Sequence, residues 1–257
     1  MAARHSTPDI DEWKNTLHFK KVSQIMANPA EHTASLLPAI HLPGLTAEQS
    51  LVVEFTWLAM ILIIGTLVFV ISNWKKVPGG LQNIVELLTS FIEDYIVDIM
   101  GPKGLPYFPL VMTVLLFVGV GNYVGLLPGS VSPTGNLSTT AAWALIVFVF
   151  YESVGVLRHG IKYFKHFFGP IPIMAPMMFV MEIISELARP FSLAVRLFAN
   201  IMGGEMIIKL LFSFCVIGLP VVWMLWDSTI TMLIQTFIFS LLTMVYLGGA
   251  LAADDEH

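Results

Sequence analysis

The chain has 257 residues, of which 56% are hydrophobic and only 12% are charged, and its mean hydropathy is +0.79. Soluble domains carry about 25% charged residues, so this composition excludes an ordinary soluble domain and indicates an integral membrane protein. The 13 lysines and arginines form no dense run, which argues against a nucleic-acid partner. The formal net charge of −5 is carried by loops and tails, and a single cysteine, Cys215, excludes an internal disulfide.

The first 50 residues are polar and are interrupted by prolines that break any long helix. We expect this segment to lie outside the bilayer, with a short amphipathic helix over residues 11–26 and no secretory signal. It would precede a membrane domain over residues 51–251 and a short acidic tail over residues 252–257.

Three apolar stretches predict the first three membrane-spanning helices, over residues 51–72, 108–127 and 141–157. A helix of about 17–25 apolar residues is long enough to cross the hydrocarbon core. Glu54 lies near the start of the first helix, where we expect it to reach the membrane interface. Asn122 is the only strongly polar residue of the second, and its glycines would allow close helix contact.

Residues 81–100 predict a helix that lies along the membrane instead of crossing it. Its apolar residues share one face, and four carboxylates (Glu86, Glu93, Asp94 and Asp98) lie on the other. Such a helix belongs at the interface or against the bundle. Because its polar face is acidic rather than basic, contact with a protein partner is an alternative to contact with lipid headgroups.

The last two helical stretches, over residues 173–217 and 220–251, are longer than a perpendicular crossing requires. About 40 residues reach about 60 Å and about 30 reach about 45 Å, whereas about 20 cross the core. Both helices should therefore be steeply inclined or broken, and Pro190 predicts a bend. The predicted fold is all-α: a polytopic membrane protein with five transmembrane helices plus one amphipathic interfacial helix, the last two transmembrane helices long and strongly tilted.

The distribution of basic residues predicts the orientation of the chain. If residues 81–100 do not cross, the basic loops all fall on one side, and the uncharged loop over residues 128–140 falls on the other. These loops contain Lys75, Lys76, Lys103, Arg158, Lys162 and Lys165. The positive-inside rule places them in the cytoplasm, with the N-terminus outside and the C-terminus inside. Lys20 and Lys21 on the outer side conflict mildly with this orientation.

Two arginines, Arg189 and Arg196, lie within a stretch at membrane depth, where each costs about 2.5–3.5 kcal/mol on insertion scales. Glu186, three residues before Arg189, could neutralise it in a structural ion pair. Arg196 has no carboxylate within one turn, so its counter-charge must come from elsewhere. Polar and small residues recur every three or four positions and share one stripe of this helix: Glu182, Ser185, Glu186, Arg189, Ser192, Arg196, Asn200 and Gly203.

This stretch resembles subunit a of F-type ATP synthases. The most specific match consists of Arg189-Pro190, Ser192-Leu193, Arg196-Leu197-Phe198, Asn200 and Gly204-Glu205. Matching pieces occur in the same order elsewhere: Asn122 with Leu126-Leu127-Pro128, Asn136-Leu137-Ser138, and Gln235-Thr236-Phe237-Ile238-Phe239 with Leu242-Thr243 and Val245-Tyr246-Leu247. The resemblance covers roughly residues 50–250.

The resemblance implies the stator of a proton-driven rotor, with two half-channels that end at a ring of c subunits. The family's invariant arginine falls at Arg196, which would keep the passing ring carboxylate ionised and block proton leakage between the half-channels. The cytoplasmic half-channel carboxylate falls at Glu182. The outer half-channel residues fall at Asn200, Glu205 and Gln235, and Arg189 and Ser192 would support the site.

The same resemblance implies partners and a location. The partners would be the c-subunit ring, the subunit b peripheral stalk and the rest of the ATP synthase complex, within the bacterial inner membrane. No cofactor, no bound metal and no catalytic residue of its own is implied.

Simpler structural roles remain open for two of these residues. Glu205 could be a helix-end carboxylate near Lys209, four residues on, and Gln235 could form a hydrogen bond that only joins two helices. Glu205 lies nine residues from Arg196, about 180° round the helix, and should therefore face the bundle interior.

The chain departs from the family pattern at two positions. Some members carry a histidine seven residues before the glutamine, where this chain has Ser228 beside Asp227, and some carry an acid where it has Gly125. Water ordered by Asn122, Glu205, Ser228 and Asp227 is the hypothesis that replaces a Glu–His pair in the outer half-channel.

Two other classes of function are weighed against this one. A self-contained secondary ion transporter with a charged site at the midplane is the alternative, although no internal repeat is visible. An intramembrane enzyme is disfavoured because the chain contains no HExxH or GxSxG motif and no paired aspartates at membrane depth.

Overall fold

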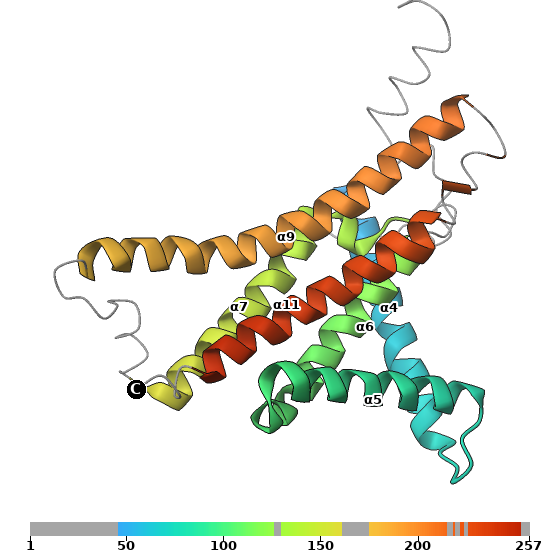
Figure 1. Ribbon diagram of the computed structural model, residues 1–257. Coiled ribbons are helices and arrows are strands. Elements are labelled where there is room, and N and C mark those ends of the chain that lie inside the picture. The colour runs from blue at the N-terminus through green and yellow to red at the C-terminus, as the bar shows by residue number, and fades with distance from the viewer. Residues whose placement is uncertain are drawn as a thin grey trace, which may run out of the picture.

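The computed structural model describes residues 46–125, 130–160, 175–214, 218, 222–223 and 226–252. The expected N-terminal helix over residues 11–26, the basic loop residues Lys162 and Lys165, and the acidic tail beyond Ala252 lie outside the described residues. In this part of the chain all regular structure is helical (Figure 1).

Six α-helices make up the described fold. They are α4 Ala47–Ser72, α5 Gly80–Met100, α6 Phe108–Val124, α7 Leu137–His159, α9 Ala175–Phe214 and α11 Met232–Ala252. Two short 3-10 helices, η1 Pro102–Tyr107 and η2 Pro133–Gly135, and a π-helix, η3 Asp227–Thr231, lie between them. Of the described helices, five are long and apolar enough to cross a membrane, and α5 is not among them. The prediction of five transmembrane helices plus one amphipathic helix is confirmed.

Capping residues explain why two helices start earlier than their apolar stretches. Thr46 forms a capping box with Gln49: its hydroxyl accepts from the Gln49 amide at 3.4 Å, and the Gln49 side chain accepts from the Thr46 amide at 3.0 Å. Asn136 caps α7 by accepting from the Ser138 amide at 2.9 Å. The expected loop over residues 128–140 therefore ends at Asn136.

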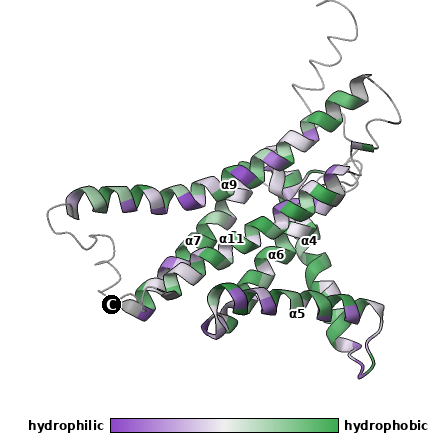
Figure 2. Cartoon of the chain, viewed as in Figure 1, coloured by the Kyte–Doolittle hydropathy of each residue, from purple (hydrophilic) through white to green (hydrophobic). Residues whose placement is uncertain are grey.

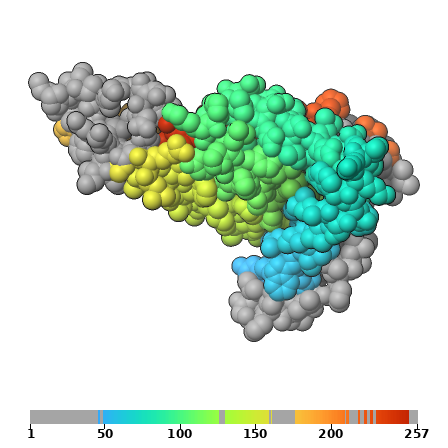
Figure 3. Space-filling model, turned by 90° about the horizontal axis from the view of Figure 1, so that it is seen from below, coloured from blue at the N-terminus to red at the C-terminus, as the bar shows by residue number. Residues whose placement is uncertain are grey.

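Helix α5 is amphipathic, as its sequence predicts. Ile92, Ile96 and Met100 are buried against the bundle, whereas Glu93 and Asp94 are exposed on the other face. In the view from below, the surface of α5 continues into that of the following segment and α6 (Figure 3). The helix thus covers one end of the bundle without crossing it.

The last two transmembrane helices differ in length: α9 has 40 residues, whereas α11 has 21, about what a perpendicular crossing needs. With its 40 residues, helix α9 is about 60 Å long along its axis. It contains Pro190, and Figure 1 shows it bent near its middle. Helix α11 continues directly from η3 and runs antiparallel to α9, diagonally across the bundle. The hydropathy colouring shows hydrophilic residues in the middle of α9, between apolar turns (Figure 2).

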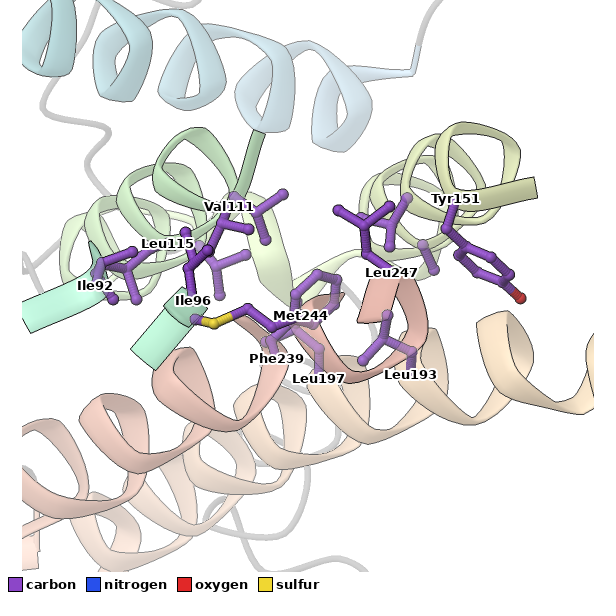
Figure 4. Close-up of a cluster of buried hydrophobic side chains, with 14 of the residues drawn as sticks. Ile92, Ile96, Val111, Leu115, Tyr151, Leu193, Leu197, Phe239, Met244 and Leu247 are labelled. Atoms are coloured by element: carbon purple, nitrogen blue, oxygen red, sulfur yellow. The ribbon is translucent and has the colours of Figure 1, made fainter. Parts of the chain in front are cut away.

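One apolar core joins α5, α6, α7, α9 and α11. Leu193 and Leu197, one turn apart on α9, point into it and meet Phe239 and Leu247 of α11 (Figure 4). Each of these four side chains is almost completely buried. This packing fixes the rotation of α9 about its axis, and therefore fixes which residues it presents outward.

The expectation that Glu54 reaches the interface is wrong. Its side chain is only 5% exposed. The segment after α6 packs against α4, and Val131 of this segment joins a small cluster that includes Leu51 and Phe55. This packing lies at the start of α4, in the same part of the helix as Glu54.

Candidate ion-translocation site

Arg196 lies on the exposed side of α9, at mid-helix. No described residue forms an ion pair or a hydrogen bond with it. Its neighbours on that side are the exposed Ser192, Val195 and Ala199. A guanidinium at this depth therefore has no counter-charge from the part of its own chain that the structure describes.

Arg189 is the opposite case, although it lies only two turns away on the same helix. Its Nη1 forms an ion pair with Glu186 Oε1 at 2.5 Å. The other carboxylate oxygen, Oε2, accepts from the Tyr151 hydroxyl of α7 at 2.9 Å. The Arg189 guanidinium carbon also lies 5.6 Å from the centre of the Tyr246 ring of α11. The i,i+3 ion pair expected from the sequence is present.

Asn200 and Gln235 meet one turn beyond Arg196. The Asn200 amide donates to Gln235 Oε1 at 2.6 Å and joins α9 to α11. Gln235 is 3% exposed, and its Nε2 is buried with no hydrogen-bond partner. A buried amide donor without an acceptor is costly, so this position favours a water molecule or an ionised group as a partner.

Glu205 and Asp227 lie further along the same end of α9. Glu205 faces η2, because a Cβ added to Gly135 would lie 3.3 Å from Glu205 Oε1. Asp227 packs on α9 itself, where a Cβ added to Gly204 would lie 2.5 Å from its Oδ2. Asp227 is 4% exposed and lies outside the membrane-spanning segments. Burial raises its pKa, and a hydrogen bond from Thr231 acts in the opposite direction. The side chain of Ser228 is not among those described.

Asn122 is the centre of a buried hydrogen-bonded network. Its amide donates to Thr236 of α11 at 3.1 Å, and its carbonyl oxygen accepts from Thr134 at 2.6 Å. Thr134 and Ser132 share a hydrogen bond of 2.8 Å, and Ser132 donates to the carbonyl of Gly121 at 3.3 Å. Asn122 thus fixes the loop between α6 and α7 against α11, which sets the position of Gly135 opposite Glu205.

Gly125 has a steric reason to lack a side chain. A Cβ at this position would lie 2.4 Å from the Cβ of Ser132. A side chain at this position would therefore collide with Ser132, which belongs to the Asn122 network.

Glu182 and Ser192 are not brought together with the other predicted residues. Glu182 is half-buried and Ser192 is exposed, both on α9. Glu182 lies fourteen residues before Arg196, about 21 Å along the helix axis, and Glu205 lies nine residues after it, about 14 Å. The two carboxylates thus lie on opposite sides of Arg196 along the axis of α9.

A role in the site was not predicted from the sequence for Tyr151, Tyr246, Ser132 or Thr134. A tyrosine inside an apolar span is a usable signal, because a buried hydroxyl needs a partner. Ser132 and Thr134 lie in a loop and give no such signal. Among the described residues there is no group of three or more side chains that could hold a metal ion.

The chain is similar to proteins of one known family over most of its length. Residues 53–248 match the family model described as ATP synthase A chain. The chain is 43% identical over 221 residues to "ATP synthase subunit a 1" of Pelobacter propionicus, covering 86% of this chain and 95% of that protein. It is 45% identical over 199 residues to "ATP synthase subunit a 2" of Syntrophotalea carbinolica, covering 77% and 85%. It is 41% identical over 216 residues to "ATP synthase subunit a" of Geobacter sulfurreducens, covering 84% and 93%.

Proposed function

This chain belongs to the ATP synthase A chain family, and from that premise we propose that it carries protons between the two sides of the membrane and a rotating ring of c subunits. As a multi-pass membrane subunit of the ATP synthase, it would couple ion flow to rotation and to ATP synthesis without catalysing a reaction alone.

The observation that carries this proposal is the guanidinium of Arg196, which no described residue neutralises. A cation at membrane depth needs a partner or a water-filled surrounding. The carboxylates of a passing rotor would supply that partner one at a time. Between encounters the fixed positive charge would repel protons, and this would keep the two half-channels from connecting.

The outward surface beside Arg196 supports the same assignment. Ser192, Ala199 and Gly203 lie within about 60° of Arg196 on the helix and have small side chains. Small residues allow another helix to approach closely within a membrane. We assign this surface to the c-subunit ring.

The two half-channels would approach Arg196 from opposite ends of α9. Glu182 would exchange protons with the cytoplasmic side. Asn200, Gln235 and Glu205 would line the outer path, and the unpartnered Nε2 of Gln235 favours water there. Asp227, Ser228 and Asn122 would order that water, in place of the histidine that other members carry.

The remaining assignments follow from the family and the charge distribution. The subunit b peripheral stalk would be a second partner, and the bacterial inner membrane the location. The N-terminal segment over residues 1–50 would lie outside, and the tail over residues 252–257 in the cytoplasm.

Replacement of Arg196 by alanine tests the function directly. We expect Arg196→Ala to abolish ATP-driven proton pumping in vesicles, measured by quenching of a pH-sensitive dye, with the complex still assembled. Arg158→Ala is the matched control, because it removes an arginine that lies against Tyr107 away from the site. Normal pumping by an assembled Arg196→Ala complex would contradict the assignment.

A further inference from the structure

Arg189 is a second cation on nearly the same face of α9 as Arg196. The two residues are seven positions apart, so they lie within about 20° of each other on α9 and about 10.5 Å apart along its axis. If the surface beside Arg196 meets a rotor, Arg189 lies at the edge of that surface. Its side chain is 36% exposed. A second active cation there would offer the rotor carboxylate another place to bind.

Contacts from three helices hold Arg189 in a neutralised state. Glu186 pairs with it on α9 at 2.5 Å, and Tyr151 of α7 donates to the second oxygen of Glu186 at 2.9 Å. The Tyr246 ring of α11 lies 5.6 Å from the guanidinium. Both oxygens of a carboxylate that is 9% exposed are thereby occupied.

Stability alone does not account for this arrangement. The Arg189 side chain is 36% exposed, and ion pairs that reach solvent add little to stability. The neighbouring packing is already apolar, through Leu193 and Leu197. With Arg189 present, an apolar residue at position 186 could not cancel its charge, whereas Glu186 does.

The two cations of this transmembrane span differ in whether an ion pair neutralises them. Within Pro176–Ile208 the basic residues are Arg189 and Arg196. With Arg189 paired to Glu186, Arg196 is the one cation of this described span that has no ion pair.

We infer that Tyr151 and Glu186 are positioning residues that keep the charge of Arg189 neutralised. A rotor carboxylate then meets a single unpaired cation, Arg196. This inference rests on the proposed function. Glu186 supplies the cancelling charge, and the Tyr151 hydroxyl holds that carboxylate in the orientation that reaches Arg189. Loss of either one exposes Arg189 as a second binding place and slows ion transfer.

A series of charge-neutralising variants in the assembled complex tests this inference. Vesicles that contain the membrane sector, stripped of its soluble part, are assayed for passive proton conduction under an imposed potential, per assembled complex. We expect Glu186→Gln to slow conduction by about tenfold, because it leaves the Arg189 charge uncancelled. Adding Arg189→Gln should restore conduction to about the wild-type rate, although the ion pair is still missing.

Two further variants complete the series. Tyr151→Phe keeps the ring contacts with Phe148 and Tyr246 and removes only the hydroxyl, so we expect slower conduction that Arg189→Gln again relieves. Glu93→Gln, an exposed carboxylate of α5, is the control and should conduct normally. If the Glu186→Gln complex fails to assemble, the comparison of Tyr151→Phe alone with Tyr151→Phe plus Arg189→Gln tests the inference.

The outcomes distinguish a purely structural ion pair from one that neutralises Arg189 for ion transfer, and both from a failure of the proposed function. If Glu186→Gln reduces the amount of complex but leaves conduction per complex unchanged, the pair is only structural and the inference is overturned. The same holds if Arg189→Gln does not relieve the slow conduction of Glu186→Gln. Those results leave the Arg196→Ala prediction standing, whereas normal pumping by Arg196→Ala would overturn the proposed function itself.

Discussion

Arg189 and Arg196 differ in their surroundings although they share a residue type, a helix and nearly a face. Local spacing predicts the difference: Glu186 lies three residues from Arg189, and no carboxylate lies within a turn of Arg196. The contacts of Tyr151 and Tyr246 are not predictable in this way, because they depend on how α7 and α11 pack against α9. The sequence therefore predicts which charge is paired, but not what holds the pair.

Gly204 gives a prediction at the scale of one residue. A methyl group there would lie 2.5 Å from Asp227 Oδ2, and Asp227 has little room to move because it is 4% exposed. We expect Gly204→Ala to destabilise the protein by about 1–3 kcal/mol through overpacking. Thermal unfolding of the purified complex in detergent measures the change.

Gly65→Ala is the matched control for that substitution. Gly65 also lies within a helix, and nothing lies within 4 Å of a Cβ placed there. Alanine is favoured over glycine inside a helix by about 0.5–1 kcal/mol, so this variant should be neutral or slightly stabilising. Equal unfolding temperatures for the two variants would show that Asp227 does not pack on Gly204.

At the scale of elements, apolar periodicity predicts the helices and capping residues set their ends. Residues 81–100 are predicted as a helix and α5 is Gly80–Met100, because its two faces differ so clearly. The loop over residues 128–140 is predicted, but its hydrogen bonds are not, since Ser132 and Thr134 acquire their roles only through Asn122 on another element.

The position of α5 gives a prediction at this scale. If α5 does not cross, Lys76 before it and Lys103 after it lie on the same side, and Ser138 lies on the other; all three are exposed. Single cysteines at these positions, in a Cys215→Ser background, are treated with a membrane-impermeant maleimide. We expect Lys76→Cys and Lys103→Cys to react from the cytoplasmic side and Ser138→Cys from the outside.

Opposite labelling of the two lysine positions would mean that α5 crosses the membrane. Joint labelling of both from the outside would keep the fold and reverse the proposed orientation. The experiment therefore tests the element and the orientation separately.

At the scale of the whole molecule, helix length predicts the inclination of α9 but not of α11, which has 21 residues. A 40-residue helix in a core about 30 Å thick must tilt or bend, and α9, which contains Pro190, is bent near its middle (Figure 1). What length cannot predict is which face of α9 is left without a partner. That face follows from the core packing of Leu193 and Leu197, which turns Arg196 outward.

The central claim is that the Arg196 face of α9 meets the ring. The most direct measurement is disulfide cross-linking, in a Cys215→Ser background, to a cysteine placed beside the ring carboxylate. Ser192→Cys and Ala199→Cys, both exposed on the Arg196 side, should cross-link under mild oxidation. Leu187→Cys, 57% exposed but about 180° from Arg196, should not. Cross-linking at Leu187 without cross-linking at Ser192 and Ala199 would contradict the account.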